Sequence, residues 1–244
     1  MKKAKIRLYI DQELSLSEII NLDKTQTHYL FNVMKQEIGN FILLFDNKTG
    51  EYLSEIISIN KRSCELKIVE KTREFESVPD LHLLFAPVKK DNNDFIIQKS
   101  TELGIKKIVP IITEYVNSHK IKIEKFKLNA IEASEQCRRV DIPQITELKK
   151  LEEVLSNWDE NRTLFYMNET GAGNDIISVF SKCDKDLLSA ILVGPEGGFS
   201  SEELEYLSSL PFTKSVTLGK RILRAETAVV SSISIWQSII GDWA

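Results

Sequence analysis

The sequence of 244 residues is poor in the residues that mark several protein classes. It has 10 glycines and 6 prolines, both below average usage, which excludes collagen-like and low-complexity chains. No run approaches the roughly 18 apolar residues of a membrane span, and the basic start MKKAKIRLYIDQEL has no apolar stretch long enough for a signal peptide. We therefore expect a soluble, cytoplasmic protein with one large domain or two small ones.

Cysteine and histidine are scarce too. The 3 cysteines are widely separated, so we expect neither a disulfide framework nor a CxxC metal pair. The 3 histidines are equally scattered, and we expect no metal site.

Charge is distributed unevenly along the chain. The formal net charge is −4, yet residues 1–150 carry 25 Lys and Arg against 22 Asp and Glu, whereas residues 151–244 carry 7 against 14. Such a drift is common in globular proteins. It nevertheless leaves the first part of the chain free to meet an anionic partner, such as nucleic acid, which the overall acidity argues against.

Short β-prone runs separated by turn residues, such as DNKTG at 46–50, fill the first 75 residues. Between them, the segment 27–40 has apolar residues at helical spacing and a glycine stop: Leu30, Val33, Met34, Ile38 and Gly39. We predict a small β-barrel with one short helix. The polar segment 71–80 is the best linker candidate.

Strands and helices alternate after this linker. Apolar strand-like runs occur at 81–88, 106–113, 162–167, 187–194 and 215–219, separated by helical patterns at 92–104, 124–139, 175–180, 200–210 and 225–240. This alternation predicts an α/β domain with a parallel sheet. The last helix is apolar nearly all round, so we expect it to be buried in a core or a subunit interface.

The segment ILVGPEGGFSSEEL, at 191–204, is the strongest local feature. Its apolar strand leads into two successive glycines, which let a ligand approach backbone N–H groups closely. Ser200 precedes Glu203 by three residues, which predicts a capping box for the next helix. The GxGxxG and GK[ST] patterns of nucleotide-binding loops are absent. An ordinary tight turn is the alternative interpretation.

A second glycine turn lies in VTLGKRILRAETAVVSS, at 216–232. Arg221 and Arg224 beside this turn could hold a phosphate or stabilise developing negative charge. The alternative is that both arginines are solvated and that Glu226 pairs with one of them.

Cations also gather at two other element ends. Arg138 and Arg139 follow the helix in IEASEQCRRVDIP, where they could simply complement the helix dipole. Lys89 and Lys90 lie where a strand enters a loop, and they could bind phosphate there. Lysines are also the default residues of a protein surface.

Four motifs in this order, IIQKSTELGIKKIVP, EASEQCRRVDIP, LVGPEGGFSSEE and TLGKRILRAETA, resemble the ribosomal RNA small-subunit methyltransferase E family, a branch of the SPOUT methyltransferases. The N-terminal HYLFNVMKQEIGN and LFDNKTGEY resemble that family's small RNA-binding domain. The match therefore covers nearly the whole chain. The combination of GPEGGFS with LGxRILRxETA is highly specific.

The resemblance implies a PUA-like β-barrel over residues 1–75 and a SPOUT domain over residues 76–244, whose C-terminal part threads a deep trefoil knot. It implies S-adenosylmethionine as cofactor, bound in a bent conformation. It also implies a homodimer with the active site near the subunit interface. The implied reaction is methylation of ring nitrogen 3 of one uridine in small-subunit ribosomal RNA, with neither a metal nor a membrane partner.

Three loops carry the cofactor-binding residues that the resemblance implies: Met167, Asn168, Glu169, Gly194, Pro195, Glu196, Gly197, Gly198, Leu218, Gly219, Ile222, Leu223, Arg224, Thr227 and Ala228. Methyl transfer from a sulfonium requires an in-line nucleophile, so positioning supplies most of the rate advantage. We expect Arg139 and Arg224 to stabilise the uridine anion or to orient the base. Glu196 and Glu226 are weaker candidates for accepting the proton or orienting these arginines.

We expect basic residues to contact the phosphates of the RNA, namely Arg7, His28, Lys35, Lys89 and Arg138, together with Lys2, Lys3 and Lys5. Two positions depart from the family's pattern. Arg138 stands where we expect glycine, and it could narrow the RNA entrance or add a phosphate contact. Lys35 stands where we expect arginine, and it keeps the charge but loses bidentate geometry.

Two other functions remain open. The same fold supports methylation of a transfer RNA ribose 2′-oxygen or of guanine, because a fold does not determine a substrate. A non-catalytic RNA- or nucleotide-binding module belongs to a different class altogether. The EQC and ILRAETA motifs favour the branch that methylates small-subunit RNA.

Overall fold

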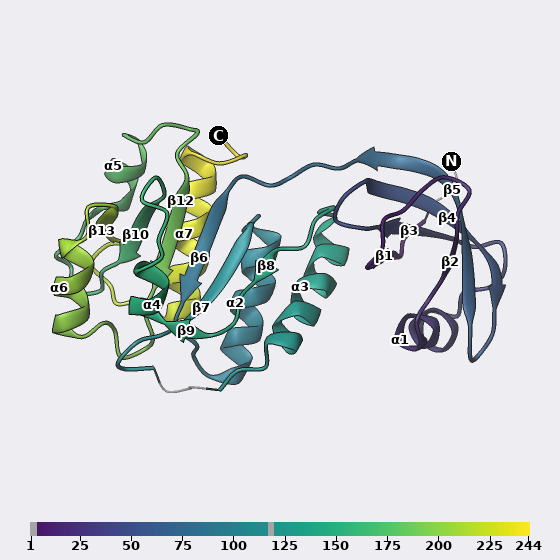
Figure 1. Cartoon of the computed structure of the whole chain (residues 1–244), viewed down its shortest axis with the longest axis horizontal. Coiled ribbons are helices and arrows are strands. Elements are labelled where there is room, and N and C mark those ends of the chain that lie inside the picture. Colours follow the sequence, from purple (N-terminus) through teal and green to yellow (C-terminus); the bar gives the residue numbers. More distant parts are fainter. Residues whose placement is uncertain (1–3, 117–119) are drawn as a thin grey trace. The chain divides into compact units, whose positions relative to one another are not determined.

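Two compact units make up the chain in a computed structural model, which describes residues 4–116 and 120–244 (Figure 1). The first unit contains the residues up to Ser77 together with Ser134–Ile142, and the second contains Val78–Ala133 and Pro143–Ala244. The sequence does not indicate that residues 134–142 belong with the first unit.

A five-stranded mixed sheet forms the first unit. Its strands, in spatial order, are β1 (Arg7–Tyr9), β3 (Phe41–Phe45), β4 (Gly50–Ile59), β5 (Cys64–Glu74) and β2 (Ile19–Asn21). Strands β1 and β3 are parallel, and the other neighbours are antiparallel, which confirms the predicted turns between β3, β4 and β5. The ladder between β4 and β5 has several register shifts, which bend and twist a sheet.

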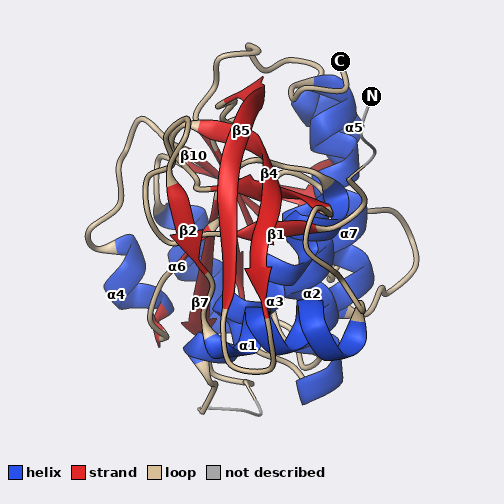
Figure 2. Ribbon diagram, turned by 90° about the vertical axis from the view of Figure 1, so that its right-hand side faces the viewer, coloured by secondary structure: helices blue, strands red, loops and turns tan. Residues whose placement is uncertain are grey.

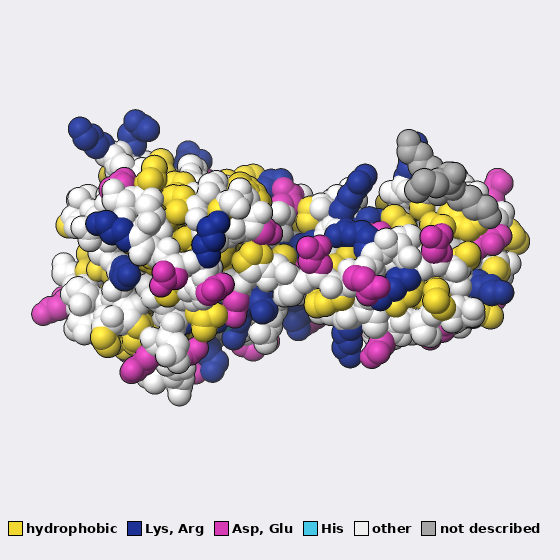
Figure 3. All heavy atoms as spheres, turned by 90° about the horizontal axis from the view of Figure 1, so that it is seen from above, with side chains coloured by type: hydrophobic (Ala, Val, Ile, Leu, Met, Phe, Trp, Pro, Cys, Tyr) yellow, Lys and Arg dark blue, Asp and Glu magenta, His cyan; other side chains and the backbone are white. Residues whose placement is uncertain are grey.

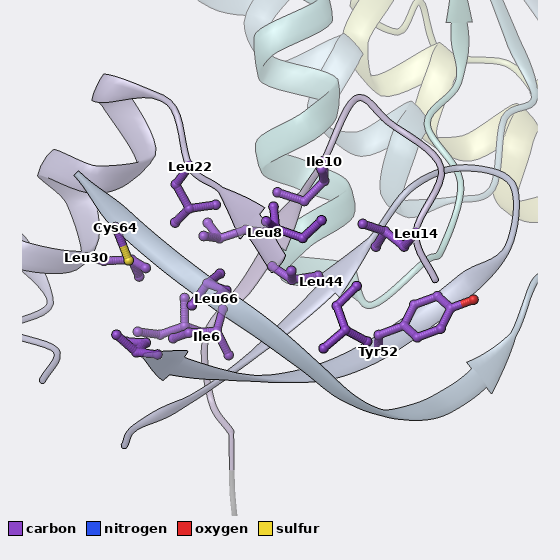
Figure 4. Packing of buried hydrophobic residues seen from close by; sticks show 14 residues of the cluster. Ile6, Leu8, Ile10, Leu14, Leu22, Leu30, Leu44, Tyr52, Cys64 and Leu66 are labelled. Carbon is purple, nitrogen blue, oxygen red and sulfur yellow. The ribbon is translucent and has the colours of Figure 1, made fainter. Parts of the chain in front are cut away.

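One apolar core packs against a single face of this sheet. Alternate residues of β5, namely Cys64, Leu66 and Ile68, are buried, whereas Lys67 and Val69 are exposed. Figure 4 shows the buried side chains of β5 meeting those of the other strands and of the helical segment around Leu30. The period of two thus sets which face of the sheet is buried.

The helix predicted over 27–40 is wrong in extent. The structure has α1 (Lys24–His28) and one π-helical segment, η1 (Tyr29–Val33), and the chain then leaves the helix. Lys35 has a φ of +51°, a left-handed conformation that a helix cannot contain. Of the predicted apolar face only Leu30 is buried, and Val33, Met34 and Ile38 are exposed.

The predicted linker over 71–80 is also shorter than expected. Strand β5 continues to Glu74 because its residues pair with the start of β4, where Glu51 lies opposite Arg73. Only residues 75–80 lack regular structure between the last strand of the first unit and the first strand of the second. Cross-strand pairing overrode the polar composition of this segment.

A wholly parallel sheet forms the centre of the second unit, which confirms the predicted α/β class. Its strands, in spatial order, are β11 (Asn174–Asp175), β13 (Thr213–Thr217), β10 (Thr163–Met167), β12 (Ser189–Val193), β6 (Leu81–Phe85), β7 (Lys107–Ile112) and β8 (Gln144–Ile145). A further strand, β9 (Lys149–Lys150), pairs with β7. All these neighbours run parallel.

Helices cover both faces of this sheet (Figure 2). On one face α7 (Ala225–Ile239) packs against α2 (Lys90–Glu102) and α5 (Ile176–Phe180), and α3 (Ile123–Cys137) contacts β6 through Phe126 and Phe85. On the other face α4 (Leu151–Leu155) and α6 (Ser201–Ser209) share a core with alternate strand residues. Within the described ranges no helix has both the length and the apolar composition to cross a membrane.

Candidate cofactor pocket and RNA-facing residues

One pocket lies at the carboxyl end of β10, β12 and β13. These three strands are adjacent and parallel, so the loops that follow them meet at the same edge of the sheet. The cavity has a volume of about 80 Å³ and opens to solvent at its mouth.

The pocket brings together most of the predicted cofactor residues: Met167, Asn168, Glu169, Gly194, Pro195, Glu196, Gly198, Leu218, Gly219, Ile222, Leu223 and Ala228. The predicted residues Gly197, Arg224 and Thr227 do not line it. Arg221 and Ala225, which lie within the predicted loop 218–227, also line it, as do Val193 and Thr217, which the motifs did not single out for the cofactor. Each of these four residues is adjacent in sequence to a residue that we predicted to bind the cofactor.

Backbone donors are available at two of these loops. The Gly198 N–H donates to the Pro195 carbonyl at 3.0 Å, which closes the turn after β12. Among the described residues, no acceptor bonds to the N–H groups of Glu196, Gly197 or residues 219–223. These groups can therefore donate hydrogen bonds to a polar ligand.

Glycine is required after β12 by the protein's own packing. Gly198 has a φ of +73°, and a Cβ atom there would lie 2.0 Å from the Glu169 Oε1 atom. The same oxygen accepts a hydrogen bond from the Phe199 N–H at 3.1 Å. A single carboxylate thus joins the loop after β10 to the loop after β12, a contact that the sequence does not indicate.

The predicted capping box is confirmed at the start of α6. The Glu203 N–H donates to the Ser200 hydroxyl at 3.2 Å, and the Ser200 N–H donates to the Glu203 carboxylate at 3.0 Å. This arrangement fixes the end of the loop, because it satisfies two N–H groups that a helix start leaves free.

Arg221 and Arg224 are exposed at the pocket loop that precedes α7. Among the described residues neither has a carboxylate within 4.0 Å, so the proposed pairing with Glu226 does not occur. Instead, one carboxylate oxygen of Glu226 is buried without a hydrogen-bond partner. Glu226 lies in the first turn of α7, where the helix dipole favours a negative charge.

Arg139 belongs to the first unit and is held in a fixed orientation. Its guanidinium donates from Nε and Nη2 to the two carboxylate oxygens of Asp141, each at 2.8 Å. Both side chains are nearly buried, at 8% and 9% exposed. A bidentate buried pair orients the arginine strongly.

The prediction that Arg7 contacts phosphate is wrong. Its side chain is only 5% exposed, and its Nε pairs with Glu51 at 2.7 Å. Its remaining nitrogens donate to the backbone carbonyls of Ser134, Glu135 and Arg139 at 2.8 to 3.0 Å. With every guanidinium nitrogen used, Arg7 anchors residues 134–142 within the first unit.

The other predicted RNA-binding residues, His28, Lys35, Lys89 and Arg138, are exposed. Lys2 and Lys3 lie outside the described residues. Figure 3 shows basic and acidic side chains interspersed on the face it presents, so phosphate contacts on this face would come from separate residues. Across both described ranges, no group of three or more His, Cys, Asp and Glu side chains could hold a metal ion.

Comparisons with known proteins cover nearly the whole chain. A family model described as an RNA methyltransferase domain matches residues 75–237, and one described as an RNA methyltransferase PUA domain matches residues 22–69. Ribosomal RNA small subunit methyltransferase E of Rickettsia conorii is 34% identical over 230 residues, which cover 93% of each chain. The enzyme of the same name from Buchnera aphidicola subsp. Schizaphis graminum is 33% identical, with 99% of each chain covered.

Solved structures give the same result. The crystal structure of Ribosomal RNA small subunit methyltransferase E from Neisseria gonorrhoeae, bound to S-adenosyl methionine, matches with a TM-score of 0.88 and 28% identity, over 98% of this chain and 99% of that one. A protein from Legionella pneumophila, in complex with the same cofactor, matches with a TM-score of 0.87 and 28% identity, over 97% and 98%. The cofactor in both is the one that the motifs imply.

Proposed function

Because the chain belongs to the ribosomal RNA small-subunit methyltransferase E family, we propose that it transfers a methyl group from S-adenosylmethionine to small-subunit ribosomal RNA. We propose ring nitrogen 3 of a uridine as the acceptor and the cytoplasm as the location. The observation that carries the proposal is the pocket after β10, β12 and β13, since it combines free backbone donors with carboxylates at the edge of a parallel sheet.

The residues of this pocket fit the chemistry of the cofactor. S-adenosylmethionine supplies an electrophilic methyl group on a sulfonium, and it carries an adenine ring and an amino acid. The carboxylates of Glu169 and Glu196 complement its positive charges. Apolar residues such as Leu218 and Leu223, with the free N–H groups of residues 219–223, suit a heteroaromatic ring. The knot and the bent cofactor remain predictions.

The acceptor nitrogen of uridine carries a weakly acidic proton, so the enzyme must favour the anion as it forms. Arg224 is suited to this because its guanidinium is exposed and has no carboxylate partner among the described residues. Glu226 has a buried oxygen without a partner, and we assign it the acceptance of the proton or the orientation of the base. Arg139 is less suited to stabilising the anion, because Asp141 pairs with its guanidinium and its side chain is only 8% exposed.

We assign RNA phosphate contacts to His28, Lys35, Lys89 and Arg138, and we propose that the protein is a homodimer. Helix α7 supports self-association, because Ile235 and Ile239 lie half-exposed four residues apart, the spacing that places two side chains on one stripe of a helix. Burying these residues against a second copy would remove apolar surface from water.

Two measurements on the purified protein test this function. Isothermal titration should show S-adenosylmethionine binding with one site per chain, and labelled methyl groups should pass from the cofactor to ribosomal RNA of small subunits that lack the modification. Transfer RNA is the matched negative substrate. Absence of binding heat would support a non-catalytic module, and labelling of transfer RNA instead would support a different methyltransferase activity.

A further inference from the structure

The loop between β13 and α7 exposes an apolar side chain at the rim of the pocket. Ile222 is 85% exposed, more than any other large hydrophobic residue that the structure describes. It borders the pocket, yet most of its surface faces water, so it adds little to the wall behind a cofactor. Single exposed apolar residues are normal, and the significance of Ile222 comes from its surroundings.

Cations surround Ile222 along the chain. Lys220, Arg221 and Arg224 are all exposed, and within the described residues none of them has an ion-pair partner. The sequence contains no Asp or Glu from Thr213 to Ala225. Unpaired cations attract a polyanion, and an exposed apolar side chain between them can pack against an apolar surface. Single-stranded or opened RNA offers both its charged phosphates and the apolar faces of its bases.

The part of the loop around Ile222, residues 219–222, is exposed. Gly219 has a φ of +103°, and a Cβ atom there would meet nothing within 4 Å. The backbone N–H groups of residues 219–223 have no acceptor among the described residues. An exposed loop segment with free backbone donors is accessible to a partner that binds at the rim of the pocket.

We propose that Ile222 packs against an RNA base next to the methylated nucleotide, while Lys220 and Arg221 bind the flanking phosphates. This inference rests on the proposed function. A ring nitrogen inside folded RNA is reached only when its base leaves the stack, and this exposes the faces of the neighbouring bases. An apolar side chain that inserts between two adjacent bases keeps them unstacked.

The test compares Ile222→Ala with Ile177→Ala, which removes a 54% exposed isoleucine of α5 that does not line the pocket. With wild-type protein and unmodified small subunits, Ile222→Ala should lower the single-turnover rate of methyl transfer about tenfold, the scale of one base contact. Ile177→Ala should match the wild type, and Ile222→Met should restore most of the rate. The rates are measured at saturating S-adenosylmethionine, and the affinity for this cofactor is titrated in parallel.

Salt dependence separates the apolar contact from the cationic one. Arg221→Ala should reduce the slope of log affinity for RNA against log salt by about 1, whereas Ile222→Ala should leave this slope unchanged. Two other results would contradict the proposed contact between Ile222 and RNA. Weakened cofactor binding by Ile222→Ala would make the residue part of the cofactor wall, and a changed molecular mass in solution would place it in a subunit interface.

The outcome also separates this inference from the proposed function. If the wild-type protein fails to methylate small-subunit RNA, the proposed function itself is wrong. If the wild type methylates this RNA and Ile222→Ala does so at the same rate, only the role of Ile222 is wrong.

Discussion

Arg138 occupies a backbone conformation that glycine adopts without strain. It directly follows the last residue of α3 and has a φ of +67°, the left-handed position that commonly ends a helix. Its carbonyl accepts a hydrogen bond from Arg73 Nη1 at 2.6 Å. The departure from the glycine of the family's pattern therefore has a structural cost as well as an added charge.

Replacing Arg138 with glycine should stabilise the protein. We expect Arg138→Gly to raise the free energy of unfolding by about 1 kcal/mol in urea titrations, because it removes left-handed strain and loses only part of that gain to chain entropy. Arg138→Ala, the control, removes the same charge but keeps the strain and should gain nothing. Equal stabilities of the two variants would contradict this account of the backbone.

His82 should make the stability depend on pH. Its burial and the nearby Arg162 guanidinium lower its pKa from 6.5 to about 4. The unfolded chain then binds more protons than the folded one between these values, so stability is complete above pH 6.5 and falls towards pH 4, by up to about 3 kcal/mol. Urea midpoints measured across this range should show the loss, and His82→Gln should flatten it. An unchanged slope in the variant would mean that other groups cause the dependence.

Gly198 should be essential to the pocket. Its φ of +73° is left-handed, and a Cβ atom there would displace the Glu169 carboxylate, so Gly198→Ala should break the hydrogen bond from the Phe199 N–H to this carboxylate and weaken S-adenosylmethionine binding about tenfold. Gly171→Ala is the matched control, since Gly171 has a similar φ of +81° but an open surrounding. Equal affinities of the two variants, measured by titration, would show that the clash is relieved without harm.

Helices and strands with a continuous hydrophobic pattern in their own sequence were predictable. Helix α7 and strand β12 are continuous local patterns, and the structure places both within two residues of the prediction. The two-residue strands β8, β9 and β11 have no local signal, because neighbouring strands alone define them. The helix over 27–40 failed since its apolar spacing continues past Lys35, where the backbone turns away.

At the scale of a helix, α7 carries the proposed self-association. Ile235→Glu places a charge in the half-exposed stripe and should convert a dimer to monomers, because burying an unpaired carboxylate is costly. Ile177→Glu on α5 is the control and should remain a dimer. Light scattering after gel filtration reports the mass. A dimer that survives Ile235→Glu would place the interface elsewhere.

At the scale of the whole molecule, the pocket was more predictable than the long-range contacts that stabilise the fold. The resemblance of its motifs to a known family identified its loops, and the structure brings these loops together because β10, β12 and β13 are adjacent parallel strands that end at one edge. The role of Arg7 was not predictable, since it depends on Glu51 and on carbonyls more than 120 residues away. Such long-range contacts leave no pattern in the neighbouring sequence.

The structure shows where the uneven charge along the chain is placed. The net positive stretch, residues 1–150, includes the exposed His28, Lys35 and Arg138 of the first unit, which we assign to RNA. The net negative stretch, residues 151–244, supplies the pocket carboxylates Glu169 and Glu196 for a cationic cofactor. The overall charge of −4 therefore averages a basic stretch and an acidic one, and within the acidic stretch the cations Lys220 and Arg221 are the ones that we assign to RNA.

Nucleoside mass spectrometry of small-subunit ribosomal RNA tests the central claim most directly. RNA from a strain that lacks this protein should be missing one methylated uridine, modified at ring nitrogen 3, and the wild-type gene should restore it while a Gly198→Ala gene should not. An unchanged set of methylated nucleosides in the deletion strain, or the loss of a 2′-O-methyl or methylguanosine residue instead, would contradict the account.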